Sequence, residues 1–487
     1  MAGSVRNSGH AVFCTEPEQT PLRNNTLATE KTRDLTTGPI WKALAVMSAP
    51  MSLGIFSVIA VGLADAYFLG QISGAALAAV GFIYPVITAL TSLSIGLSAG
   101  ANSALSQGIG GGADKDDTQR LGVHAIGLGI GLSLLLGGII WMSFPLLFGA
   151  LGATDDVARE VAQYMPLWAL SFPFLVTMMI INSVFRSHGD GATSAAIMIV
   201  AAFFGIALNP VFIFGLGPIP EMGTAGAALS TLIGRIVAMC IAMWIAWQRG
   251  LLGVVGNVLD GLAANMRKIL NVGLPASLSN AINPAGMALV TAAVATVGDD
   301  AVAGFGAAGR VQSILLVPLM ALSAGIGPVV GQNWGAQKKD RAQNATQCAF
   351  GFSLAYGVLV GVLLLLLASP IAGLLASSES DQAYAATYLR VVGLTFFGYG
   401  MVVIANAAMN ARDKAIWSMS LSLGRILVVY LPLAWLGVSL FGYIGIVVAA
   451  ALANVIGGIA AAFAVRKTEL LSLGFSRSGN AKKTRLA

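Results

Sequence analysis

Residues 97–110 read LSAGANSALSQGIG, and residues 322–335 read LSAGIGPVVGQNWG. The second segment repeats the first after a shift of 225 positions, which places Leu97 on Leu322. The same shift places Gln107 on Gln332 and Gly110 on Gly335. Four consecutive identities followed by spaced matches are improbable by chance, even between helices rich in Ala and Gly. The chain therefore contains an internal repeat, and its two halves are expected to fold alike. The same shift superposes Pro50 on Pro275, Ser52-Leu53 on Ser277-Leu278, and Gly81 on Gly306.

The composition places both halves in a membrane. Of the 487 residues, 56% are hydrophobic and 10% are charged, and the mean hydropathy is +0.81. A soluble domain carries about 25% charged residues, so this chain lacks the polar surface of a protein that folds in water. A soluble enzyme, a nucleic-acid-binding protein and a disordered scaffold are thereby excluded. The three cysteines are widely separated, which suggests neither a disulfide framework nor a metal site.

The apolar runs are long enough to cross a bilayer many times. A transmembrane helix needs about 20 apolar residues, and from Trp41 onward long apolar runs alternate with short polar breaks. We predict an all-α polytopic membrane protein with six spans in each repeat, so that both copies enter the membrane in the same sense. The twelve predicted spans lie near 43–69, 76–106, 121–148, 162–185, 194–216, 223–247, 268–297, 302–333, 346–376, 388–410, 416–438 and 441–465.

The charges between the spans predict the orientation. Basic residues gather in every second break and in the tails, whereas the other breaks are mainly acidic. Cytoplasmic segments are enriched in Lys and Arg, so both termini are expected on the cytoplasmic side of an inner (plasma) membrane. The basic residues of the predicted cytoplasmic breaks are Lys115, Arg120, Arg186, Arg249, Arg267, Lys268, Lys338, Lys339, Arg341, Arg412 and Lys414.

The spans and charges together divide the chain into five segments. Residues 1–40 are predicted to be a mobile polar tail, 41–247 an N-terminal lobe, 248–267 a cytoplasmic linker, 268–465 a C-terminal lobe, and 466–487 a basic tail. In transporters built from such repeats, substrates bind near the midplane and one half rocks against the other. The repeat therefore favours a transporter.

Asp65 is the one acidic residue inside a predicted span. An ionisable group at membrane depth is by default functional, and burial disfavours its charged form. Such a carboxyl group can bind a proton, a sodium ion or a cationic substrate in competition, which is the basis of an antiporter. Alternatively, Asp65 lies only five residues before Gly70, about 7 Å along the helix, and its side chain simply extends into the outer interface.

Two Pro-containing positions are candidates to assist Asp65. Asn209-Pro210 is predicted mid-way along the fifth span, where the amide and a freed backbone carbonyl would help coordinate an ion; a packing kink is the alternative. Pro50 lies in the first span and removes a helix hydrogen bond. It is either a hinge that responds to the charge of Asp65 or a static kink.

The remaining polar residues of the spans give weaker indications. Arg235, Arg310 and Arg425 are expected to face protein or water rather than lipid, with pairing to backbone carbonyls favoured for Arg310. His188 is expected to have a turn role. The glycines at 110–112 form no phosphate-binding loop, and no catalytic triad or metal cluster is visible. The sequence therefore predicts no cofactor and no enzyme.

Several of these residues together resemble the multidrug and toxic compound extrusion (MATE) family. Residues 303–342 are similar to the family's eighth-helix signature, and 62–70, GLADAYFLG, to its first-helix aspartate motif. Residues 209–215, NPVFIFG, resemble the fifth-helix motif, and Arg425 with Leu431-Pro432-Leu433 the eleventh. The signature positions in the eighth helix include Gly306, Arg310, Pro318, Pro328, Gly331, Gln332, Asn333, Trp334, Gly335 and Ala336.

The resemblance implies two six-helix lobes in a V shape that export organic cations against proton or sodium influx. Pro50 matches a first-helix proline thought to bend in the branch related to DNA-damage-inducible protein F. The chain departs from the family twice, because the region expected to hold a seventh-helix glutamate offers only Asn280 and Asn283, and Asn209 stands where some members have aspartate. A second coupling carboxylate is therefore not expected.

These observations predict a secondary antiporter that exports amphipathic, often cationic drugs or toxic compounds in exchange for H⁺ or Na⁺. Asp65 would hold the coupling proton or sodium ion, with Asn209 assisting and Pro50 and Pro210 as hinges. The expected partners are small-molecule substrates and the lipid bilayer, with no nucleic acid, and the expected state is a monomer. A flippase for lipid-linked precursors, from the same wider superfamily, is the first alternative, and an intramembrane enzyme is the second.

Overall fold

The structure, a computed structural model, describes residues 33–471 apart from 151, 153, 254–255 and 376–377. The described residues form fifteen α-helices and one π-helical segment, and they contain no strand. The elements are α1 (Ile40–Gly70), α2 (Gly74–Gly110), α3 (Lys115–Ala150), α4 (Asp155–Ser187), α5 (Gly191–Ile213), α6 (Gly223–Gln248), α7 (Leu262–Ala295), α8 (Asp299–Leu315), α9 (Val317–Gly335), α10 (Lys339–Gly373), α11 (Glu379–Gly393), α12 (Phe396–Ala411), α13 (Ala415–Leu423), η1 (Gly424–Tyr430), α14 (Leu431–Phe441) and α15 (Tyr443–Lys467).

Two of the spans are bent pairs of helices. Ten helices of the described chain are long and apolar enough to cross a membrane, counting α13, η1 and α14 as one, and the pairs α8–α9 and α11–α12 bring the number to twelve. The bends measure 43° and 61°. The first follows from Pro318 in the opening turn of α9, since Pro has no N–H to donate and its ring clashes with the preceding turn. The predicted fold class is thus confirmed.

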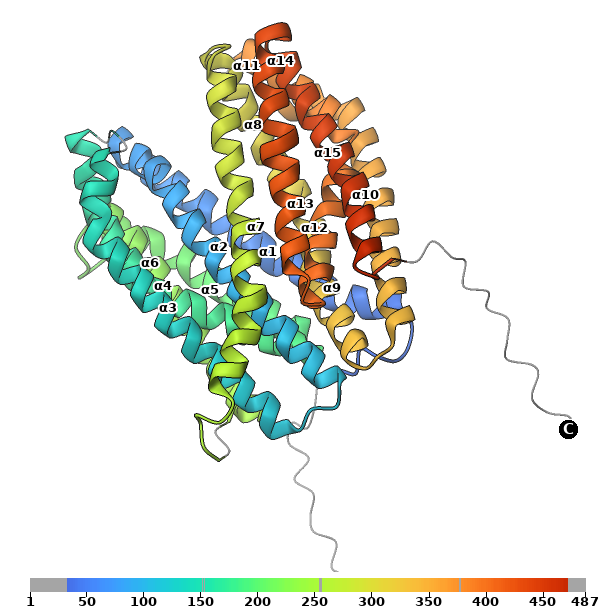
Figure 1. Cartoon of the computed structure of the whole chain (residues 1–487). Helices are drawn as coiled ribbons and strands as arrows, with labels where there is room; N and C mark the ends of the chain where they lie inside the picture. The colour runs from blue at the N-terminus through green and yellow to red at the C-terminus, as the bar shows by residue number, and fades with distance from the viewer. Residues whose placement is uncertain (1–32, 151, 153, 254–255, 376–377, 472–487) are drawn as a thin grey trace, which may run out of the picture.

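The twelve spans form two lobes that meet at one end (Figure 1). Helices α1–α6 make the first lobe and α7–α15 the second, and the lobes diverge away from the end that carries the turns 111–114, 188–190, 336–338 and 412–414. We call this end the joined end. Each lobe has its own core of large side chains, which includes Trp168 and Phe172 in the first and Phe305 and Phe396 in the second.

Glycines allow the helices of the two lobes to approach closely. The lobes touch through α2 against α7 and α1 against α9. A methyl group on Gly100 of α2 would overlap the carbonyl of Ile269, and one on Gly325 of α9, the equivalent position of the repeat, would overlap Ser48. The glycine-rich repeat is therefore used for packing between the lobes.

Two predicted boundaries differ in the structure. Helix α7 begins at Leu262, so the segment between the lobes is shorter than the predicted 248–267. Residues 1–32 and 472–487 of the predicted tails lie outside the described residues, but residues 33–39 pack against the joined end, where Leu35 is 1% exposed. The expectation of a mobile tail through residue 40 is therefore wrong for this part, because Leu35 is apolar and its backbone is hydrogen-bonded.

Candidate functional site

The structure brings Asp65 and Asn209 together inside the first lobe. The Asn209 amide Nδ2 donates to Oδ1 of Asp65 at 2.6 Å, across the contact between α1 and α5. Asn209 is fully buried, and Asp65 is partly buried near the end of α1. Of the two interpretations of Asp65, the geometry favours a side chain directed at α5 over one that only extends into the interface.

Asn209 and Pro210 lie in the last turn of α5, not mid-way along it as predicted. Helix α5 ends at Ile213 because Gly215 and Gly217 follow in left-handed conformations, with φ of 73° and 65°. Pro210 therefore has almost no helix beyond it to swing, and its carbonyl accepts the N–H of Phe214 at 3.3 Å. The free oxygen of the pair is instead Oδ1 of Asn209, which is buried and without a partner among the described residues.

Arg235 of α6 and Tyr164 of α4 complete the surroundings of Asp65. Arg235 of α6 interacts electrostatically with both Asp65 and Tyr164. Its guanidinium donates to the Ser171 hydroxyl and lies over the ring of Trp168, 5.4 Å from the centroid. Arg235 was predicted to face protein or water rather than lipid, and its guanidinium contacts side chains of α4. Tyr164 and Trp168 carry no signal in the sequence that separates them from other aromatic residues of the spans.

Pro50 lies inside α1, which continues through it from Ile40 to Gly70. The neighbouring Met47 and Met51 are buried, and α1 packs on both α5 of the first lobe and α9 of the second. Pro50 therefore lies in the part of α1 that packs on both α5 of its own lobe and α9 of the second lobe.

The predicted eighth-helix motif lies at the joined end, away from Asp65. Gln332 donates through Nε2 to the Ser187 carbonyl of the first lobe at 2.7 Å and accepts the Leu35 N–H at 2.9 Å. Asn333 donates to the Leu35 carbonyl at 3.1 Å and accepts from Arg341 at 3.0 Å. This part of the motif therefore joins the two lobes and residues 33–39 to one another.

Some of the other motif residues lie in the contact between the lobes, and Arg310 lies on the surface. Pro328 and Gly331 are buried in α9, and a methyl group on Gly331 would come within 2.5 Å of the Ser106 hydroxyl of α2. Gly335 packs against Gln107. Arg310 is exposed on α8, and no hydrogen bond joins it to the described residues. The expected pairing of Arg310 with backbone carbonyls is therefore not found.

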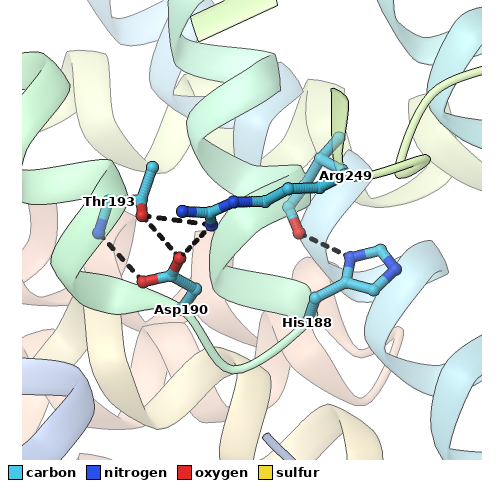
Figure 2. A network of polar contacts seen from close by, with 5 residues as sticks. His188, Asp190, Thr193 and Arg249 are labelled. Atoms are coloured by element: carbon cyan, nitrogen blue, oxygen red, sulfur yellow. Dashed lines mark hydrogen bonds and ion pairs between the residues drawn. The ribbon is translucent and has the colours of Figure 1, made fainter. Parts of the chain in front are cut away.

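A second polar cluster lies at the joined end of the first lobe (Figure 2). Asp190 caps α5 by accepting the Thr193 N–H at 2.9 Å, and it pairs with Arg249 at 2.5 Å. Burial alone would raise the pKa of Asp190, but the hydrogen bonds from Thr193 and Arg249 outweigh it and hold the pKa below its ordinary value. His188 ends α4 with Nδ1 2.8 Å from the Val184 carbonyl, and burial lowers its pKa. Its turn position agrees with the prediction.

Comparison with known proteins gives the same family as the sequence motifs. The MatE family model matches residues 50–211 and again residues 275–436, so the two matches begin and end 225 residues apart. A protein named FAD transporter from Shewanella oneidensis is 33% identical over 88% of this chain and 94% of its own length. The probable multidrug resistance protein NorM of Thermotoga maritima is 24% identical over 78% of this chain and 82% of its own.

A solved structure shares the fold over most of the chain. The Vibrio cholerae MATE transporter VcmN in its bent form superposes with a TM-score of 0.83 at 26% identity, and the match covers 89% of this chain and 99% of that one. Together with the duplicated family match, this identifies the internal repeat as two copies of the MatE unit. The chain belongs to the MATE family and is an efflux transporter of the membrane.

Proposed function

We propose that this transporter exports amphipathic, often cationic organic compounds in exchange for protons or sodium ions, and that Asp65 with Asn209 binds the coupling ion. The observation that carries the proposal is the 2.6 Å hydrogen bond between the two side chains. This bond uses only one carboxylate oxygen of Asp65. The other carboxylate oxygen and the unpartnered Oδ1 of Asn209 are then available together as oxygen ligands. Hard cations such as Na⁺ bind oxygen ligands of this kind, and a proton can take the carboxylate alone.

Coupling between ion binding and a change of conformation follows from the single negative charge of Asp65. Arg235 is the cation that interacts with Asp65 in the structure, so protonation or sodium binding at Asp65 weakens that attraction and changes how α1 packs on α5 and α6. Pro50 transmits the change, because a helix bends at low cost where a hydrogen bond is already missing. Helix α1 reaches the second lobe through α9, so its bending acts on both lobes.

The charge distribution supports the orientation that we propose. The turns at the joined end carry the basic residues Lys338, Lys339, Arg412 and Lys414, and the opposite turns carry Asp155, Asp156, Glu221, Asp299 and Asp300. Under the positive-inside rule, the joined end is cytoplasmic and the lobes diverge toward the outside of the inner membrane. Both termini then lie in the cytoplasm, and we propose a monomer, in which one chain supplies both lobes.

A second candidate cargo is a flavin dinucleotide. The relative from Shewanella oneidensis that is named FAD transporter covers nearly the whole chain at 33% identity. Flavins are amphipathic, so their export and that of drugs are compatible with one transport cycle.

Transport in proteoliposomes tests the proposal, with a pH gradient and a sodium gradient imposed in separate experiments. The wild-type protein should move ethidium or FAD under at least one gradient, and Asp65→Asn should reduce gradient-driven transport to the level of liposomes without protein. Asp156→Asn is the matched control, because this carboxylate is exposed and, among the described residues, its ion-pair partner is Arg159 at 3.5 Å. Wild-type transport by Asp65→Asn under the full gradient would contradict the coupling role.

A further inference from the structure

The second lobe contains a polar interior centred on a buried arginine. Ser422 and Arg425 lie on the span α13–η1–α14 and face α7, where Ser279 is 2.7 Å from Ser422 and Asn283 is 2.6 Å from Arg425. Asn406 of α12 adds a hydrogen bond to Ser422 at 2.9 Å. These contacts lie on helices that are otherwise strongly apolar, and polar groups at that depth are by default functional.

Arg425 has no acidic partner. Its side chain is 7% exposed, and neither its own span (α13, η1 and α14) nor the helices whose side chains contact it (α7, α12 and α15) contain Asp or Glu. Tyr388 of α11 also interacts with Arg425 electrostatically, but the acidic residues of that helix, Glu379 and Asp381, lie about two turns or more before Tyr388. None of the ion pairs found among the described residues involves Arg425. Its contacts are neutral: Asn283 at 2.6 Å, Asn454 at 3.4 Å and the face of the Tyr399 ring at 4.7 Å. A buried charge that is not neutralised is costly, so the site favours an anion.

The unpaired polar atoms nearby are mostly donors. Nε of Arg425 and the hydroxyls of Tyr430 and Tyr443 are buried without a hydrogen-bond partner among the described residues. Tyr430 lies close enough to interact electrostatically with both Arg425 and Tyr443. A guanidinium with two hydroxyl donors is the chemistry that recognises phosphate and carboxylate groups.

The guanidinium of Arg425 is separated from the surface by the side chains that contact it. Asn283 and Tyr399 contact it directly, and both are partly exposed. Arg425 itself belongs to the π-helical segment η1, a local geometry often found at functional sites. Rotation of Asn283 would open a path to the guanidinium, and the ring of Tyr399 offers an aromatic surface beside it.

The repeat shows that this site is particular to the second lobe. The 225-residue shift places Arg425 on Val200 and Asp65 on Val290, so neither charge has a counterpart in the other half. In the first lobe Asp65 lies beside Arg235, whereas Arg425 of the second lobe has no acid on the helices whose side chains contact it. The two lobes therefore offer different polar groups. A compound that carries two different polar groups fits such unlike sites better than two identical sites.

We propose that Arg425 and Asn283 form a subsite that binds the phosphate groups of an anionic aromatic compound during export. The inference rests on the proposed function and adds the substrate class, a phosphate-bearing compound such as a dinucleotide. The anion would replace Asn283 as the acceptor for the Arg425 guanidinium. Its aromatic part would lie against Tyr399.

Binding of two flavins to the purified full chain tests the proposal. FAD and riboflavin share the isoalloxazine ring, but riboflavin lacks the phosphate groups and the adenosine of FAD. The ratio of the riboflavin dissociation constant to the FAD dissociation constant therefore includes the contribution of the anion subsite, which the Arg425 variants isolate. Wild-type protein should bind FAD more tightly, and Arg425→Gln should lower this ratio at least about tenfold, as expected when a charged partner of a phosphate is removed. Arg425→Lys should restore part of the ratio, and Arg390→Gln, a surface arginine bonded to Ser369, should leave it unchanged.

Two further measurements separate this subsite from the proposed function. Pyrophosphate alone should raise the thermal unfolding midpoint of the wild-type protein and not of Arg425→Gln, whether or not any flavin is transported. Ethidium transport should persist in Arg425→Gln at more than half the wild-type rate. An unchanged ratio of dissociation constants in Arg425→Gln, an equal fall in Arg390→Gln, loss of ethidium transport together with FAD binding, or no stabilisation by pyrophosphate would each overturn the subsite.

Discussion

Gln107 and Gln332 hold equivalent positions in the two repeats, and each donates a hydrogen bond into the opposite lobe. Nε2 of Gln107 lies 2.7 Å from the carbonyl of Ala411 at the end of α12, and Nε2 of Gln332 lies 2.7 Å from the carbonyl of Ser187 at the end of α4. The accepting carbonyls belong to helix ends, which have no partner within their own helix. The joined end is therefore closed by two related contacts.

Removing one of these glutamines should loosen the joined end. Gln332→Ala deletes the bonds to Ser187 and Leu35, at about 1 kcal/mol each. We expect spin labels on the turns 111–114 and 336–338 to show a larger share of long distances in pulsed electron resonance. Gln343→Ala is the control, because Gln343 bonds to Glu469 within the second lobe. Equal distance distributions for both variants would disprove the inter-lobe role of Gln332.

A methyl group on Gly335 should have a similar effect by steric means. It would overlap the carbonyl of Gln107, and such overpacking costs about 1–3 kcal/mol. We expect Gly335→Ala to lower the thermal unfolding midpoint and to lengthen the same label distances. Gly108→Ala should change neither, because the nearest side-chain atom to its added methyl group is 3.8 Å away.

Leu35 should stabilise the joined end although it precedes the first helix. Its side chain is 1% exposed, and truncation of a buried leucine to alanine costs at least about 2 kcal/mol. Leu35→Ala should therefore lower the unfolding midpoint in detergent, whereas Thr37→Ala, at an exposed position of the same segment, should not. A midpoint equal to that of Thr37→Ala would mean that residues 33–39 contribute no stability.

The Asp190–Arg249 pair should make stability depend on acid pH. The pKa of Asp190 is lower in the folded protein than in the unfolded chain, so its charge stabilises the fold above about pH 4 and the contribution is lost as the pH falls further. We expect Asp190→Asn to lower the unfolding midpoint near neutral pH, with a difference from wild type that shrinks on acidification. The exposed carboxylate of Asp156 serves as control, since Asp156→Asn should change the midpoint little at any pH. A constant difference across the titration would argue against the charge as the cause.

The sequence was sufficient for the architecture because length, composition and charge each constrain a membrane protein strongly. The twelve spans and the repeat follow from local patterns. The pairing of Asp65 with Asn209 was one of two alternatives in the sequence, because it depends on how α1 packs on α5. The role of Gln332 does not follow from local patterns, since it depends on which helix ends of different lobes meet. Residues 33–39 were misassigned because a single apolar residue, Leu35, gives no pattern. The isolation of Arg425 emerged only once the structure showed which helices surround it.

The contacts at the joined end also bear on the origin of the chain. Gly110 packs on Gln332 as Gly335 packs on Gln107, which is the arrangement that a twofold axis imposes on two identical subunits. A gene for one six-helix unit that formed a homodimer through this surface would need only duplication and fusion to give the present chain. Fusion frees each copy to change alone, so one half can acquire Asp65 and the other Arg425 while the shared joint stays the same.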